Sequence, residues 1–264
     1  MSELRILVMG GIAGGTIFLG LPIGRLRSLR PGPRQFLNAL AIGILLFLVW
    51  DVLAHGFIPV DTALTHLHDR TGGLGPVLGY SALFLGGIAT GLLGLIYYER
   101  WLGRRTASPS TLTPAKHLAM LIAVGIGLHN FGEGLAIGAS SAKGQIGLAT
   151  VLVIGFALHN ATEGFGIVAP FAAEQDRPSW KFLFWMGIIG GGPTFVGTLL
   201  GSQFTSDAVS VVFLSLAAGS ILYVVEQLLG VAHRRGSREI LGWGLACGLA
   251  AGFITDMIVT AGGA

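Results

Sequence analysis

Long apolar runs that contain almost no charge constrain the fold of this chain more than any other feature. Eight of them follow one another, each close to the roughly 20 residues that an α-helix needs to cross a bilayer. The runs cover about residues 5–24, 36–58, 77–98, 116–139, 146–171, 181–203, 208–229 and 239–261. Only short polar or proline-containing stretches separate them. The sequence therefore predicts an all-α fold, a polytopic membrane helix bundle with eight transmembrane helices that takes up residues 1–264 as one domain.

The composition argues against a water-soluble or disordered chain. Charged residues make up 11% of the sequence, against about 25% in soluble domains, which is too little for a wetted surface. The 43 glycines suit transmembrane helices that pack closely against one another. The single cysteine, Cys247, permits no internal disulfide and no cysteine-based metal site.

Basic residues alternate between the loops in a way that predicts which side of the membrane each loop faces. The stretches after the first, third, fifth and seventh runs hold 13 of the 16 basic residues, namely Arg25, Arg27, Arg30, Arg34, Arg100, Arg104, Arg105, Lys116, Arg177, Lys181, Arg234, Arg235 and Arg238. Cytoplasmic loops carry such an excess of Lys and Arg. We therefore predict that these loops are cytoplasmic and that both termini lie outside. The excess positive charge then needs no nucleic-acid partner to explain it.

One short polar pattern occurs twice inside the apolar runs. The letters HNxxEG appear near the middle of the fourth and the fifth run, 30 residues apart. The residues concerned are His129, Asn130 and Glu133 in the first copy, and His159, Asn160 and Glu163 in the second. Residues three or four apart lie on one face of a helix, so the three side chains of each copy can converge. Imidazole, carboxylate and amide oxygen bind first-row divalent metals, and the pattern predicts a metal site within the membrane.

A purely structural role explains these side chains less well. A lone histidine or asparagine in a membrane helix often makes only an interhelical hydrogen bond, worth about 0.6 kcal/mol. Two glutamates in one bundle repel each other and need a cation or protons nearby. Without a thiolate, the donor set suits zinc, iron(II), manganese or cobalt better than copper(I). The duplicated acids therefore favour the metal site.

Other ionisable residues lie in the outer half or near the ends of the runs. Asp51 and His55 are four residues apart in the second run; they line a metal entrance or add ligands, or they are an ordinary polar pair facing the outer vestibule. Glu226, near the end of the seventh run, and Asp256, toward the end of the eighth, are candidate exit or proton sites. Contact with water at the helix ends is the simpler explanation for both.

Two stretches are expected to be irregular. The residues that follow the second run, including Asp61, His66, His68 and Asp69, are interpreted as a solvated loop. The glycines at 190–192, followed by Pro193, are expected to break or kink the sixth helix.

The paired HNxxEG motifs on the fourth and fifth of eight spans resemble those of the Zrt/Irt-like (ZIP) metal transporters. The stretch AAGSILYVVEQLL at residues 217–229 is also similar to a recurrent stretch of that family. The resemblance covers nearly the whole chain. It implies a homodimer in the bacterial plasma (inner) membrane that moves divalent metal toward the cytoplasm. Zinc is the first choice of substrate, with iron, manganese, cobalt or cadmium as others; membrane lipid is the other partner, and no prosthetic group is expected.

The resemblance also implies two neighbouring metal positions that share both glutamates. The ligands of the first position would be His129, Glu133 and Glu163, with His159 beside them. The ligands of the second position would be Asn130, Asn160, Glu133 and Glu163. Asp51 or His55 would be the additional ligand from the second span.

Two positions depart from the family pattern. Many members carry proline directly before the glutamate of the fourth span, where this chain has Gly132. Many also offer a glutamate before the proline of the sixth span, and the matching position here is Gly192. The second metal position would then be poorer, so that a mononuclear site stays open.

The predicted function is transport of divalent metal ions and not catalysis. An intramembrane metal-dependent hydrolase remains the alternative, because the same ligands can hold a catalytic zinc. A haem carrier with His129 and His159 as axial ligands fits poorly with a carboxylate one turn from each histidine. A structural scaffold leaves the duplicated acids unexplained.

The predicted orientation can be checked with single cysteines in a Cys247→Ser chain. Ser108→Cys, in the basic stretch after the third run, is expected to react with a membrane-impermeant maleimide only after spheroplasts are permeabilised. Thr71→Cys, on the opposite side, is expected to react in intact spheroplasts. The reverse pattern would show that the assignment of sides is wrong.

Overall fold

The structure, a computed structural model, describes residues 3–26, 31–105, 113–142, 144, 146–173, 177–203, 206–235 and 237–261. These residues form α-helices and two short 3-10 helices, and no strand is found among them. The elements are α1 (Glu3–Gly15), α2 (Ile17–Gly20), η1 (Leu21–Arg25), α3 (Pro31–His68), α4 (Leu74–Arg105), α5 (Pro114–Ala142), α6 (Ile146–Val168), η2 (Ala169–Ala173), α7 (Trp180–Gly201), α8 (Asp207–Arg235) and α9 (Arg238–Ala261). The all-α prediction is confirmed.

The described part of the chain contains eight segments that are long and apolar enough to cross a membrane. They run over Leu4–Arg25, Gln35–His68, Leu74–Trp101, Pro114–Ala142, Leu152–Phe171, Trp180–Gly201, Asp207–His233 and Arg238–Ile258. Each corresponds to one of the runs in the sequence, with ends that differ by a few residues in most cases. The chain is thus an integral membrane protein with the predicted number of spans.

The second span is longer than the sequence indicated. α3 continues past residue 58 to His68, with Pro59 inside it, so the stretch interpreted as a solvated loop is mostly helical. The next turn of α3 buries Val60 and Ala63, which are 2% and 7% exposed, and this packing offsets the cost of the proline. The helix closes where the N–H groups of Thr71 and Gly72 donate to the carbonyl of His66, both at 2.9 Å.

The first and sixth spans also differ from expectation. The first is interrupted at Thr16, whose hydroxyl donates to the Ala13 carbonyl at 2.7 Å, between α1 and α2. The sixth, α7, is one helix through the glycines at 190–192 and through Pro193, so a break at this point is wrong, while a kink stays a prediction. Gly191 serves close packing, because a Cβ atom on it would lie 2.1 Å from the Gly14 carbonyl oxygen.

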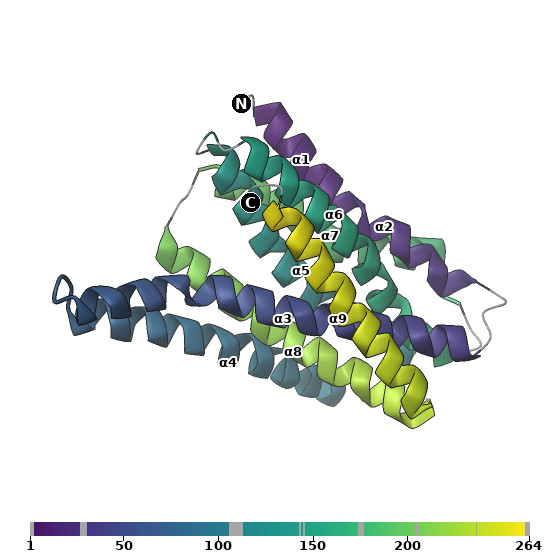
Figure 1. Cartoon of the computed structure of the whole chain (residues 1–264). Helices are drawn as coiled ribbons and strands as arrows, with labels where there is room; N and C mark the ends of the chain where they lie inside the picture. The colour runs from purple at the N-terminus through teal and green to yellow at the C-terminus, as the bar shows by residue number, and fades with distance from the viewer. Residues whose placement is uncertain are drawn as a thin grey trace.

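The helices associate in two groups. α1, α2, α5, α6 and α7 pack on one another, and α3, α4, α8 and α9 form the second group. Figure 1 shows α3 and α4 as a long antiparallel pair, with α9 crossing α3 and α1 running beside α6 and α7. α5 packs against α8, and α6 packs against α3 and α9, so that α5 and α6 lie where the two groups meet. These are the helices that carry the HNxxEG copies.

Close contacts between backbones hold each group together. A Cβ atom on Gly91 of α4 would lie 2.2 Å from the carbonyl oxygen of Leu216 in α8. The same holds for α3 and α9, where a Cβ atom on Gly248 would lie 2.2 Å from the Leu40 carbonyl oxygen. Small residues allow this approach in a membrane, where dispersion contacts between helices replace the hydrophobic effect.

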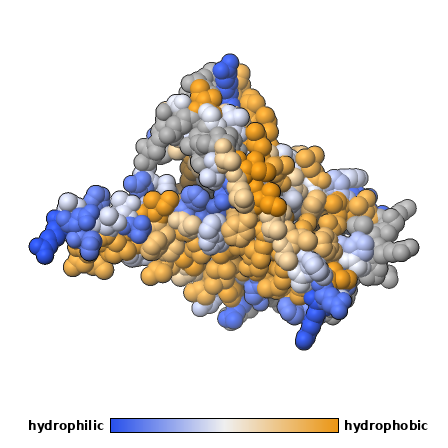
Figure 2. All heavy atoms as spheres, viewed as in Figure 1, coloured by the Kyte–Doolittle hydropathy of each residue, from blue (hydrophilic) through white to orange (hydrophobic). Residues whose placement is uncertain are grey.

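Large apolar side chains cover much of the outer surface. Trp243 on α9 is 71% exposed and Leu78 on α4 is 66% exposed. Figure 2 shows apolar residues over the middle of the visible face, with hydrophilic residues at its extremities, such as the end where α3 meets α4. This distribution suits a surface that faces lipid.

The close packing of the glycines predicts that alanine substitutions at two positions of α4 differ in their effect on stability. Gly91→Ala is expected to lower the free energy of unfolding by about 1–3 kcal/mol, because the new methyl group overpacks the α4–α8 contact. Gly94→Ala is the matched control, since nothing lies within 4 Å of a Cβ atom there. Thermal unfolding in detergent measures both; a Gly91→Ala protein as stable as Gly94→Ala would contradict the packing.

Candidate functional site

Three ionisable side chains from the two HNxxEG copies lie in one buried cluster. Nε2 of His129 is 3.1 Å from Oε1 of Glu133, one turn later on α5, and 3.9 Å from Oε1 of Glu163 on α6. His129 is 3% exposed, Glu133 4% and Glu163 2%. The structure therefore brings one histidine and both glutamates of the motif together.

The register of the two helices produces this cluster. His129 and Glu133 are four residues apart and share a face of α5, and α6 packs beside α5 so that Glu163 approaches the same imidazole. An ionisable group at the centre of a membrane helix costs roughly 2.5–3.5 kcal/mol on insertion scales. The histidine reduces this cost for the two glutamates only partly, since the two acids repel each other.

The two asparagines turn their amide groups toward neighbouring helices. Nδ2 of Asn130 donates to the carbonyl of Gly190 in α7 at 3.0 Å, and Nδ2 of Asn160 donates to the carbonyl of Ala13 in α1 at 3.1 Å. Both residues are 0% exposed. Neither amide oxygen has a hydrogen-bond partner among the residues that the structure describes. Each HNxxEG copy thus makes a hydrogen bond to one neighbouring helix through its asparagine, and the amide oxygen of that asparagine is a buried acceptor.

The second histidine of the motif is only partly characterised. His159 lies on α6, but its side chain is outside the described part of the structure. Among the side chains that are described, no group of three or more His, Cys, Asp or Glu residues is placed to hold a metal ion together. Nε2 of His129 instead contacts the Glu133 carboxylate directly. The assignment of the six motif residues as metal ligands therefore stays a prediction.

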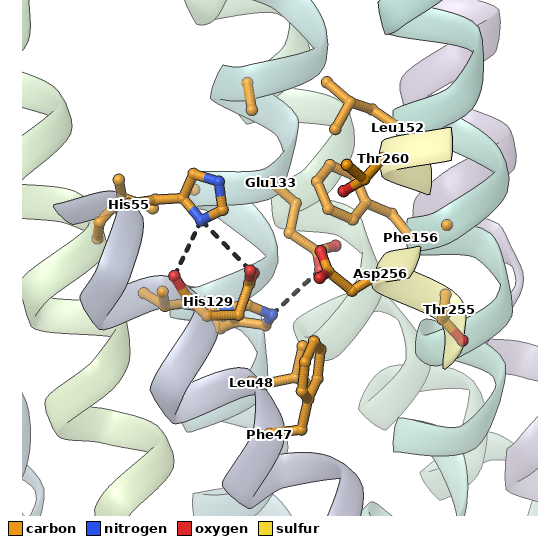
Figure 3. A pocket seen from close by; sticks show the side chains of 16 residues that line it. Phe47, Leu48, His55, His129, Glu133, Leu152, Phe156, Thr255, Asp256 and Thr260 are labelled. Carbon is orange, nitrogen blue, oxygen red and sulfur yellow. Dashed lines mark hydrogen bonds and ion pairs between the residues drawn. The ribbon is translucent and has the colours of Figure 1, made fainter. Parts of the chain in front are cut away.

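A cavity of about 450 Å³ leads to this cluster. Its lining includes His129 and Glu133, together with Asp51 and His55 of α3 and Asp256 of α9. Figure 3 shows His129 joined to Glu133 by a dashed line, with Asp256 of α9 among the side chains that line the same cavity. The cavity connects polar side chains from three different helices.

Asp51 and His55 form an ion pair at this cavity. Nδ1 of His55 is 3.3 Å from Oδ1 of Asp51 and 2.9 Å from the Asp51 carbonyl oxygen. The side chain of His55 is 60% exposed and that of Asp51 is 24% exposed. This gradient places His55 at the mouth and Asp51 further in, on the way to Glu133.

Two acidic residues near helix ends behave differently from each other. Asp256, for which contact with water at a helix end was the simpler explanation, lines the cavity and interacts electrostatically with Asp51 and His55. The signal that could have identified it is an acid in an apolar run with Thr255 and Thr260 nearby in sequence, both of which line the same cavity. Glu226 is exposed on α8 and is not among the residues that line this cavity.

The side chains gathered here are of the kinds that bind cations. Carboxylates, an imidazole and amide oxygens are donors that divalent metal ions accept, and burial strengthens the electrostatic interactions of such groups. The carboxylates of Asp51 and Asp256 extend negative charge along the cavity, which raises the local concentration of cations.

Comparison with known proteins gives two consistent matches. Residues 99–229, which contain both HNxxEG copies, match the family model described as ZIP Zinc transporter. The chain is 28% identical over 257 residues to the zinc transporter ZupT of Salmonella arizonae, covering 92% of each chain. It is also 28% identical over 269 residues to the zinc transporter ZupT of Escherichia coli K12, covering 97% of this chain and 98% of the relative. The family resemblance carried by the paired motif is confirmed.

The charge of the cluster predicts the effect of removing one acid in the absence of metal. Glu163→Gln is expected to raise the free energy of unfolding of metal-free protein by about 1–3 kcal/mol, because it removes the repulsion between the two buried carboxylates while His129 keeps its closer contact with Glu133. Thermal unfolding in detergent with a chelator is the measurement. A lower melting temperature for Glu163→Gln than for wild type would show that the carboxylate is stabilised by its surroundings without a cation.

Proposed function

We propose that this chain is a member of the ZIP family and transports divalent metal ions across the bacterial inner membrane into the cytoplasm, with zinc as the principal substrate. The main support for the proposal is the buried cluster of His129, Glu133 and Glu163, of which His129 and Glu133 line a cavity. A metal ion compensates two buried carboxylates, which a protein without a cation must otherwise keep protonated or pay for in stability.

The ligands of the transported ion come from both HNxxEG copies. His129, Glu133 and Glu163 supply the imidazole and the carboxylates, and His159 adds a second imidazole from α6. The amide oxygens of Asn130 and Asn160, which are buried without a hydrogen-bond partner among the described residues, are further donors on the same two helices.

The contact between His129 and Glu133 gives the empty carrier a defined state. Their 3.1 Å contact keeps the imidazole and the carboxylate together when no metal is bound, and an incoming ion replaces it with bonds from each group to the metal. When the ion leaves, the contact forms again, so that the carrier returns to the state that takes up the next ion.

Asp51, His55 and Asp256 guide the ion to this cluster. They lie along one cavity with the more exposed groups at its mouth, and negative charge along an apolar wall concentrates cations. Stepwise replacement of hydration water by carboxylate oxygens lowers the barrier to entering the membrane. The working unit is a homodimer, as the family resemblance implies.

Uptake into proteoliposomes tests this function. Wild type is expected to show saturable uptake of zinc, with iron(II), manganese, cobalt and cadmium as competitors that rank the substrates. Glu133→Ala/Glu163→Ala is expected to lower uptake to the level of protein-free liposomes, because both carboxylate ligands are lost. Asp69→Ala, which removes an exposed acid in the turn after α3, is the matched control and is expected to retain wild-type uptake.

Two results would contradict the proposal. Normal uptake by the double variant would place the transport site elsewhere in the bundle. Zinc that binds tightly to wild type but never crosses the membrane would favour the intramembrane hydrolase.

A further inference from the structure

A fully buried threonine on α7 lies one turn after the point where Asn130 contacts that helix. Asn130 donates to the carbonyl of Gly190 at 3.0 Å, and Thr194 is four residues further along and 0% exposed. α7 contributes no ionisable side chain to the cluster described above. Thr194 is therefore a polar group of this helix close to the HNxxEG copies.

The hydroxyl of Thr194 differs from those of Thr198, Ser215 and Ser220, and it shares the lack of a hydrogen-bond partner among the described residues with the hydroxyl of Ser141 near the end of α5. Oγ1 of Thr194 is buried and has no hydrogen-bond partner among the described residues. Thr198, on the next turn and also 0% exposed, donates to the Thr194 carbonyl at 2.8 Å. Ser215 and Ser220 likewise donate to carbonyls of their own helix, at 2.6 Å and 2.7 Å. Such bonds are the usual solution for a hydroxyl within a helix.

The motif competes with Thr194 for one of its possible acceptors. A helical threonine can donate to the carbonyl three or four residues earlier, and the one four residues before Thr194 belongs to Gly190. That carbonyl already accepts from Nδ2 of Asn130. The first HNxxEG copy thus takes up one of these acceptors, next to a threonine whose hydroxyl makes no bond to a described residue.

Thr194 also adjoins the contact made by the second copy. A Cβ atom placed on Gly14 of α1 would lie 3.1 Å from Cβ of Thr194. Ala13, the residue before Gly14, accepts from Nδ2 of Asn160 at 3.1 Å. Asn130, Asn160 and Thr194 therefore meet around the same segments of α1 and α7. Each of them keeps a buried oxygen without a hydrogen-bond partner in the described part of the chain.

We infer that the Thr194 hydroxyl is a ligand of the transported divalent cation, contributed by α7 together with the amide oxygens of Asn130 and Asn160. This rests on the proposed function. A buried oxygen without a hydrogen-bond partner destabilises the fold, and three of them around the same segments of α1 and α7 are explained by an occupant that accepts their lone pairs. Gly192, one residue before Pro193, has no side chain that could bind a metal ion. Thr194 then supplies an oxygen from α7 instead.

The neutral charge of this oxygen sets its effect on selectivity. Oxygen ligands without nitrogen suit manganese, whereas imidazole suits zinc. Zinc held by His129 and the glutamates depends less on Thr194 than manganese does. The hydroxyl therefore widens the range of metals that the chain accepts and adds no further buried negative charge.

Three variants test this inference through manganese and zinc uptake in proteoliposomes. Thr194→Val keeps the shape of the side chain and removes the hydroxyl, and it is expected to raise the half-saturating manganese concentration about tenfold, which corresponds to about 1.4 kcal/mol. The change for zinc is expected to be smaller. Thr194→Ser retains the hydroxyl and is expected to stay within about twofold of wild type. Thr198→Val, the matched control, removes a hydroxyl that is already bonded and is expected to leave the manganese-to-zinc ratio unchanged.

Stability without metal separates a ligand from a structural hydroxyl. In a chelator, Thr194→Val is expected to melt at or above the temperature of wild type, because a buried hydroxyl without a partner is removed. The rise in melting temperature on adding manganese is expected to shrink in Thr194→Val but not in Thr198→Val. Thr194→Ala serves the same comparison where valine is not accommodated.

The outcomes that overturn the inference differ from those that overturn the function. Wild-type uptake and a wild-type manganese-induced rise in melting temperature in Thr194→Val would exclude the hydroxyl as a ligand, as would an equal loss in Thr198→Val. Wild type that moves no metal would refute the proposed function. The melting-temperature comparison would then decide on the ligand by itself.

Discussion

Two carboxylates buried against the same imidazole are the constraint on which the rest of this structure depends. Glu133 and Glu163 come from different helices, yet both lie within 4 Å of Nε2 of His129. Both acids are almost fully buried, where electrostatic interactions are strong, so small changes in the register of α5 and α6 change the interaction of both. The surrounding helices must therefore fix the position of α5 relative to α6 within a fraction of a turn.

The asparagines and glycines provide that fixed position. Asn130 connects α5 to α7, and Asn160 connects α6 to α1, each through a side-chain hydrogen bond to a backbone carbonyl. Such bonds require neighbouring backbones to come close, which the glycines permit; a Cβ atom on Gly134 would lie 2.1 Å from the carbonyl oxygen of Thr194. The same short motif thus serves both packing and hydrogen bonding. Its glycine lets a neighbouring backbone come close, and its asparagine donates a hydrogen bond to a neighbouring backbone.

Where the expected irregular stretches proved helical, a local signal was overridden by packing. The polar residues after the second run were interpreted as a loop, but Val60 and Ala63 are buried on a further turn of α3. The glycines before Pro193 indicated a break or a kink, yet α7 remains one helix, and Gly191 faces the backbone of α1. Asp256 lies near the end of α9, as expected, but nothing in its neighbourhood along the chain shows that α9 crosses α3 beside the cavity.

The sequence by itself determined the number of spans, the helical class and the pairing of two HNxxEG copies, because each depends only on composition and on periods of three or four residues along one helix. Tertiary structure decided that Glu163 reaches His129, that Asp51 and Asp256 share one cavity, and that Asn130 donates to the carbonyl of Gly190, four residues before Thr194. These relations join residues far apart in the chain. They arise from the crossing positions of helices, which close backbone packing sets and no single apolar run contains.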